Sequence, residues 1–125
     1  MAQKIKKNKD SSEELAMAVI AGMQEKKAQK IKLLNLKNVK NAIADYFVIA
    51  EASSDTQIEA VADSVEELVS KNLAQMPWQR EGWGKKDWIL LDYLDVVVHI
   101  FKPEKRYFYG LEELWGDAEI TEIND

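Results

Sequence analysis

The chain contains no cysteine and only one histidine, His99. Disulfide frameworks, thiolate zinc sites and cysteine nucleophiles are therefore excluded, and so is a metal site built on several imidazole ligands. Glycine is scarce as well, with five residues in the chain, and no glycine-rich loop followed by lysine is present that could hold a phosphate. We therefore expect no cofactor, no metal ion and no catalytic residue.

Long apolar runs and an excess of positive charge are absent too. No run approaches the ~20 apolar residues of a membrane span, and the basic opening MAQKIKKNKD is followed by no apolar signal core. We expect a cytoplasmic protein. Because the formal net charge is −5, broad binding to phosphate backbones is disfavoured. A protein partner, with little direct nucleic-acid contact and no membrane contact, is the expectation.

The length and composition are those of one soluble globular domain. The chain has 125 residues, of which 46% are hydrophobic and 31% charged. We expect a flexible basic N-terminus over residues 1–10, a single domain over residues 11–118, and an unstructured acidic tail over residues 119–125.

Apolar periodicity predicts an α/β fold of the mixed (α+β) kind. The run Ser11-Ser12-Glu13-Glu14 has the pattern of a capping box, so a helix is expected to begin there. Ser54 and Gln57 repeat that pattern before a long amphipathic stripe, which Pro77 ends. β-branched and aromatic runs predict about five strands, with residues 45–50 as a central one. The two main helices are expected on one face of the sheet.

Residues 87–101, DWILLDYLDVVVHIF, are predicted to form a hairpin that turns at Tyr93-Leu94, with Trp88 opposite His99. One strand face is then wholly aliphatic and suits the core. The other face carries a mixed aromatic and acidic set: Trp88, Leu90, Asp92, Asp95, Val97, His99 and Phe101.

Two helices cannot cover both faces of such a sheet, since a helix is about 10 Å wide and strands lie about 4.8 Å apart. One face should be partly open, and aromatic side chains rimmed by acids are typical of protein interfaces. The alternative is that residues 107–115 fold back over this face and bury it.

Each residue that could take part in catalysis or metal binding also has a purely structural explanation. Asp92 and Asp95 could hold a magnesium ion, but aspartate also favours turns because it bonds the local backbone. Ser53-Ser54 is explained by helix capping. His99 lacks a designated nucleophile, so a strand histidine packed against Trp88 is the preferred interpretation.

Several segments together resemble the ribosomal silencing factor family, also called Iojap-like proteins. The resemblance covers roughly residues 12–118, in order. Its segments are Asp45-Tyr46-Phe47-Val48-Ile49-Ala50, Ser53-Ser54, Glu81-Gly82, Asp87 to Tyr93, Asp95 to Phe101, Arg106, and Phe108-Tyr109-Gly110-Leu111-Glu112-Glu113-Leu114-Trp115.

The resemblance implies a nucleotidyltransferase-like fold without catalysis. It also implies a bacterial protein that binds the large ribosomal subunit through its ribosomal protein fourteen and blocks joining of the small subunit when nutrients are short. The contact residues that it implies lie on the mixed face and beside it: Trp88, Leu90, Asp92, Tyr93, Val97, His99 and Phe101.

One position departs from the family pattern. Family members usually carry glycine where this chain has Leu94, and glycine tolerates positive φ at a turn whereas leucine does not. A different turn geometry would change the pairing of Trp88.

Two rival interpretations stay open. One is a nucleotidyltransferase-like, magnesium-dependent enzyme using Asp92, Asp95 and Asp45. The other is a homodimer of the free protein that hides the same patch.

Overall fold

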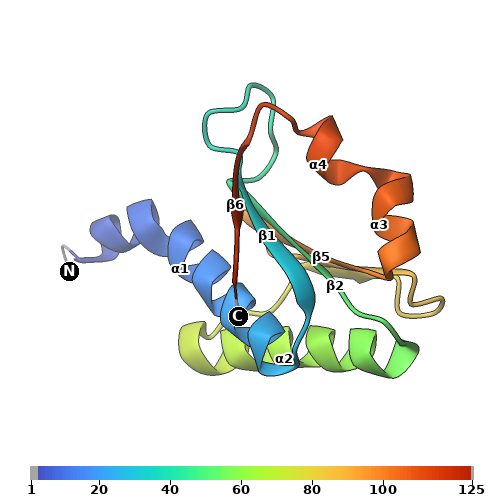
Figure 1. Ribbon diagram of the computed structural model, residues 1–125. Helices are drawn as coiled ribbons and strands as arrows, with labels where there is room; N and C mark the ends of the chain where they lie inside the picture. The colour runs from blue at the N-terminus through green and yellow to red at the C-terminus, as the bar shows by residue number, and fades with distance from the viewer. Residues whose placement is uncertain (1–2, 125) are drawn as a thin grey trace.

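The computed structural model describes residues 3–124, with side chains described throughout this range except at 3–10, 107–109 and 113. Figure 1 shows a twisted sheet with helices on both of its sides. In chain order the elements are α1 (Gln3–Glu25), β1 (Gln29–Asn35), β2 (Tyr46–Glu51), α2 (Asp55–Leu73), β3 (Gln79–Glu81), β4 (Trp88–Asp92), β5 (Val96–Phe101), α3 (Pro103–Tyr109), α4 (Leu111–Leu114) and β6 (Glu119–Glu122).

The strands form one six-stranded mixed sheet in the order β3-β4-β5-β2-β1-β6. β2 and β5 are parallel, with Val48 opposite Val98, and the other neighbouring pairs are antiparallel. Parallel neighbours need a crossover connection, which α2 supplies. Every residue of β2 and β5 is buried. The predicted mixed α/β fold and central strand are confirmed, with six strands where about five were expected.

The two long helices pack side by side against one face of the sheet, as predicted (Figure 1). A Cβ at Gly22 would lie 2.8 Å from the Cα of Val65, so the backbones of α1 and α2 approach closely there. Ser64 Oγ donates to the Gly22 carbonyl at 2.8 Å at the same crossing. The core between helices and sheet includes Leu15, Val19 and Met23 from α1, Ile58, Val61 and Val65 from α2, and Ile89, Leu91, Val98 and Ile100 from the strands.

The start of α2 follows the sequence prediction and its end does not. Ser54 Oγ accepts the Gln57 N–H at 3.1 Å, and Gln57 Oε1 accepts the Ser53 N–H at 2.9 Å, so the capping prediction is confirmed. The helix ends at Leu73 rather than at Pro77, because Ala74 adopts a left-handed conformation with φ 54° and its N–H donates to the carbonyl of Ser70.

The first helix begins earlier than predicted. α1 starts at Gln3, not at the serine pair, and Ser12 is buried within the helix, 4% exposed. Lysine and glutamine, which dominate residues 3–9, are good helix formers. The expected flexible N-terminus is therefore helical from residue 3, and residues 1 and 2 lie outside the described range.

The acidic C-terminal residues form a strand where an unstructured tail was predicted. β6 pairs antiparallel with β1, with Leu33 opposite Thr121. Its residues are all exposed, so backbone hydrogen bonding to the outer edge of β1 supports it more than side-chain burial does. The sheet therefore continues past residue 118; that the chain forms one domain stays a prediction. Within residues 3–124, no helix combines the length and apolar character that a membrane span requires.

Candidate functional site

The predicted mixed face exists, in a register that differs from the prediction. Trp88 lies opposite Phe101, Leu90 opposite His99, and Asp92 opposite Val97. The predicted pairing of Trp88 with His99 is thus wrong by two residues. Because side chains alternate with a period of two along a strand, a shift of two residues leaves each side chain on its predicted face.

This face is more covered than predicted. Val97, His99 and Phe101 are 6%, 3% and 0% exposed, so these residues of β5 present no surface to a partner in the folded chain. On β4, Trp88, Leu90 and Asp92 are partly exposed, and Asp95 in the turn is exposed. We call Trp88, Leu90 and Asp92 the β4 row.

The cover comes from the C-terminal helices and from the loop before β2. Figure 1 shows α3 and α4 on the side of the sheet away from α2. Leu111 and Trp115 join the cluster beneath this cover, and the Trp115 ring lies 5.8 Å from that of Phe47 in an edge-on arrangement. The alternative in which residues 107–115 fold back over the face is therefore correct for the β5 half. The side chains of residues 107–109 are outside the described set.

Tyr93 lies away from the predicted face. It belongs to the core on the helix side and is 6% exposed. Burial, with the nearby Glu66 carboxylate, raises the pKa of its phenol far above the usual range. The sequence led us to expect Tyr93 among the contact residues, and its burial in the core corrects that expectation.

A partly buried hydrogen bond fixes the indole of Trp88, which is itself partly exposed. The Trp88 indole N–H donates to Nδ1 of His99 at 3.1 Å, which places the histidine proton on Nε2. Burial lowers the pKa of His99 to about 3, so the imidazole is neutral. The Trp88 ring also stacks on Phe101 with centroids 5.0 Å apart. The predicted packing of His99 against Trp88 is confirmed, and the indole is held rigidly where it reaches the surface.

Asp92 stabilises the turn through its side chain, whereas the contact of Asp95 is made by its backbone. Asp92 Oδ1 accepts the N–H of Leu94 at 2.8 Å, and the Asp95 carbonyl accepts the N–H of Asp45 at 2.8 Å. Among the described residues, no three His, Asp or Glu side chains come together in an arrangement that could hold a metal ion.

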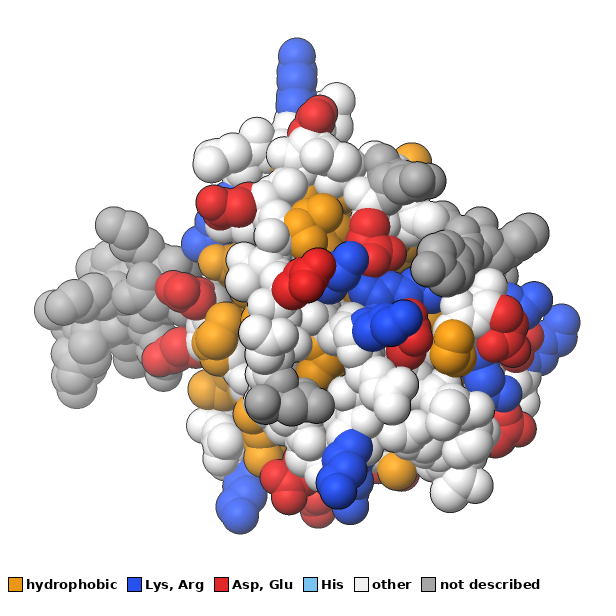
Figure 2. Space-filling model, in the orientation of Figure 1, with side chains coloured by type: hydrophobic (Ala, Val, Ile, Leu, Met, Phe, Trp, Pro, Cys, Tyr) orange, Lys and Arg blue, Asp and Glu red, His pale blue; other side chains and the backbone are white. Residues whose placement is uncertain are grey.

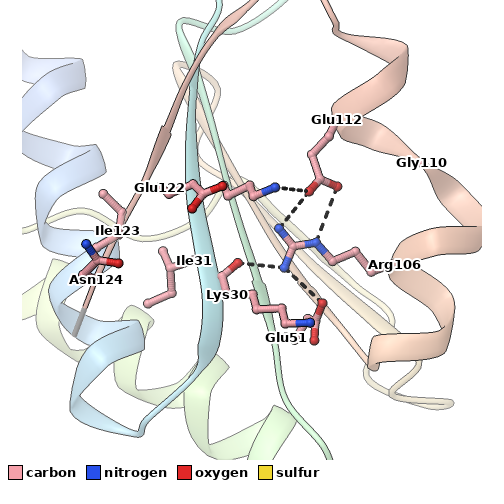
Figure 3. A pocket seen from close by; sticks show the side chains of 10 residues that line it. Lys30, Ile31, Glu51, Arg106, Gly110, Glu112, Glu122, Ile123 and Asn124 are labelled. Carbon is pink, nitrogen blue, oxygen red and sulfur yellow. Dashed lines mark hydrogen bonds and ion pairs between the residues drawn. The ribbon is translucent and has the colours of Figure 1, made fainter.

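A second cluster, which sequence reasoning missed, surrounds Arg106 of α3. Its guanidinium donates to the Lys30 carbonyl at 2.7 Å, to Glu51 at 3.3 Å, and to both carboxylate oxygens of Glu112 at 3.0 and 3.4 Å. Lys32 pairs with Glu112 at 3.3 Å. Figure 3 shows Arg106, Glu51 and Glu112 pointing toward one another from α3, β2 and α4. They line a cavity whose volume is about 620 Å³. The cluster ties α3 and α4 to the sheet.

Charges of both signs are interspersed on this side of the molecule. Figure 2 shows acidic and basic side chains alternating over it, without a broad area of one sign. In the cluster, burial raises the pKa of Glu112, but the hydrogen bonds and charges of Arg106 and Lys32 outweigh that effect and leave it below its usual value. The arrangement is that of a satisfied ion-pair network.

Comparison with known proteins identifies several relatives of this chain. Residues 9–125 match a family model described as "Ribosomal silencing factor during starvation". A relative from Halalkalibacterium halodurans, named ribosomal silencing factor RsfS, is 34% identical over 90% of this chain and 95% of its own. One of the same name from Bacillus subtilis is 36% identical over 83% of this chain and 86% of its own.

A solved structure and a more distant relative agree with these matches. A crystal structure of a Chromobacterium violaceum protein superimposes with a TM-score of 0.77 and 28% identity, covering 83% of this chain and 85% of that one. A mouse relative, 32% identical over 57% of this chain and 32% of its own, is named "Mitochondrial assembly of ribosomal large subunit protein 1".

Proposed function

This chain belongs to the ribosomal silencing factor family, and from that premise we propose that it binds the large ribosomal subunit and represses translation in the cytoplasm. It docks on ribosomal protein fourteen of that subunit, on the surface where the small subunit would join. The family's description names starvation, so we place its action under nutrient limitation. The mouse relative's name, which refers to the large subunit, supports this choice of subunit.

The observation that carries the proposal is the β4 row. Trp88 is partly exposed, yet its ring is fixed by the hydrogen bond to His99 and by stacking on Phe101. A rigid aromatic side chain loses little entropy on binding and is the residue type that most often dominates interface energies. Leu90 and Asp92 extend the same row with an apolar and an acidic group.

The mechanism requires occupancy of a surface and no chemical step. A 14.3 kDa domain seated on part of the subunit contact excludes the small subunit by steric overlap. The net charge of −5 favours a basic protein surface and disfavours bare RNA. Affinity should fall with added salt, though less steeply than for a protein that neutralises many phosphates.

The test is co-sedimentation with separated large and small subunits, using the wild type and Trp88→Ala. The wild type should travel with the large subunit alone, and Trp88→Ala should weaken binding by about 2 to 4 kcal/mol if the indole is an anchor. Met17→Ala is the matched control, because Met17 is an exposed apolar residue, 46% exposed, on α1 of the opposite layer. Because Trp88→Ala also removes the hydrogen bond to His99 and the stacking on Phe101, its thermal midpoint should be lower. Binding is therefore compared at a temperature at which circular dichroism shows every variant to be folded.

Two results would contradict the proposal. Wild-type protein that stays at the top of the gradient with either subunit would remove the ribosome as partner. Binding that is unchanged in Trp88→Ala would remove the β4 row as the docking surface. Sedimentation of the free protein over a range of concentrations distinguishes the competing interpretation, in which a homodimer covers this row.

A further inference from the structure

Leu94 adopts a backbone conformation that suits glycine. Its φ is 76°, and the N–H of Asp95 donates to the carbonyl of Tyr93 at 3.0 Å across it. A hydrogen bond that spans one residue with positive φ defines the rarer, strained form of γ-turn. Glycine accepts this conformation at little cost, whereas a residue with a Cβ does not.

The strained residue also exposes an apolar side chain. Leu94 is 55% exposed, and Asp95 after it is exposed too, whereas Tyr93 before it is buried. A leucine that is both strained and exposed contributes little to the fold, and strain of this kind is found where function maintains it.

Two further exposed apolar residues come from segments joined to this turn. Ile43 is 85% exposed and Trp78 is 68% exposed. The Asp95 carbonyl accepts the N–H of Asp45 at 2.8 Å, which holds the loop containing Ile43 against the turn. The Trp78 N–H donates to the carbonyl of Asp92 at 2.7 Å, which holds that segment at the end of β4. We call Ile43, Trp78 and Leu94 the sheet-end patch.

The charges around the sheet-end patch are mainly acidic. Asp95 is exposed and Asp45 and Asp92 are partly exposed, and all three lie at the hydrogen bonds that join the patch. Lys37 and Lys40 belong to the loop that carries Ile43, which leaves the carboxylates in excess. Exposed apolar residues among acids fit a protein surface with apolar pockets and a basic rim.

We propose that the sheet-end patch is a second part of the docking surface for the same basic large-subunit protein, with Leu94 as the contact residue particular to this chain. The inference rests on the proposed function. Asp92 makes the two surfaces continuous, because it ends the β4 row and its carboxylate caps the turn at the Leu94 N–H. A contact made by Leu94 accounts for a strained leucine at a position that glycine would fill without strain.

The decisive variant is Leu94→Gly, which removes the side chain and relieves the backbone at once. Burial of a leucine side chain corresponds to about a 10- to 100-fold change in Kd. We therefore expect Leu94→Gly to bind large subunits about 10-fold or more weakly while its thermal midpoint rises. Ile43→Ser, which alters an exposed loop residue, should weaken binding as well, and Met17→Ala should bind as the wild type does.

The outcomes separate this inference from the proposed function. If Trp88→Ala binds weakly while Leu94→Gly and Ile43→Ser bind as tightly as the wild type, the sheet-end patch is not a contact and the β4 row stands alone. If the wild type binds neither subunit, the proposed function fails and this inference fails with it. Weaker binding by Leu94→Gly together with a raised thermal midpoint supports it, because lost folding cannot explain that pair of results.

Discussion

Replacing Arg106 by methionine should destabilise the protein more than replacing any exposed lysine. Arg106 is 6% exposed and Glu51, its partner on β2, is 5% exposed. The variant removes the cation and leaves the Glu51 carboxylate buried in the sheet without it. It also removes the donor to the Lys30 carbonyl, which is 2.7 Å away in the wild type.

The expected loss is about 3 to 5 kcal/mol of the free energy of unfolding, the usual cost of removing one member of a buried ion pair. Single domains are stable by roughly 5 to 15 kcal/mol, so the variant should be marginally folded. Removing both charges, in Glu51→Met combined with Arg106→Met, should restore a large part of this loss, because apolar side chains of similar volume replace the pair.

The assay is equilibrium unfolding in urea, followed by circular dichroism and extrapolated to water. Lys86→Met is the matched control, because Lys86 pairs with Glu59 at 3.5 Å on the surface, with side chains 25% and 45% exposed. Such pairs contribute about 0 to 1 kcal/mol. A loss in Arg106→Met no larger than in Lys86→Met, or a double variant less stable than Arg106→Met, would refute the account of this cluster.

Two further predictions concern His99. His99→Phe should weaken large-subunit binding, because it removes the acceptor that orients the Trp88 indole, and His99→Gln, whose carbonyl oxygen is an acceptor, should recover part of that binding. An indole N–H resonance that moves in His99→Phe and returns toward its original position in His99→Gln checks the orientation directly. As the pH falls, the unfolded chain binds a proton first, because the pKa of His99 is lowered from 6.5 to about 3 in the folded protein by burial. The free energy of unfolding should therefore hold above pH 7 and decrease by up to about 1.4 kcal/mol per pH unit between roughly pH 6.5 and 3. A His99→Gln variant that keeps the wild-type slope between pH 6.5 and 5 would contradict this assignment.

Elements with covered faces could be predicted from the sequence. Residues 46–50 are apolar on both faces, which a strand requires only when both sides of the sheet are covered. The stripe that begins at Ile58 and the capping pair before it identified α2, since both signals are local. The faces of β4 and β5 also followed from alternation alone.

The register of the hairpin depends on the positive φ of Leu94, a conformation that leucine does not predict. A two-residue turn at Tyr93-Leu94 was the simplest interpretation, whereas the chain places three residues between the strands and bends through positive φ at Leu94. Leucine gives no signal for that conformation, as glycine would have done. The sequence indicated a different turn in one way, because leucine stands where family members usually carry glycine.

The covering of the mixed face by α3 and α4 depends on contacts between residues that are far apart in the sequence. Arg106 reaches Glu51 and Lys30, which are 55 and 76 residues away in the chain, and no periodicity encodes such pairs. β6 was missed for a related reason, because its exposed side chains carry no apolar pattern and its pairing uses the backbone.

If a protein bound to the large subunit prevents the small subunit from joining, light scattering should report the loss of subunit association. Purified large subunits are incubated with increasing amounts of the protein before small subunits and magnesium are added, and the order of addition is then reversed. We expect a dose-dependent loss of scattering when the protein meets the large subunit first, a smaller effect when it meets the small subunit first, and a weaker effect with Trp88→Ala. Full association at saturating protein, in either order, would contradict this expectation.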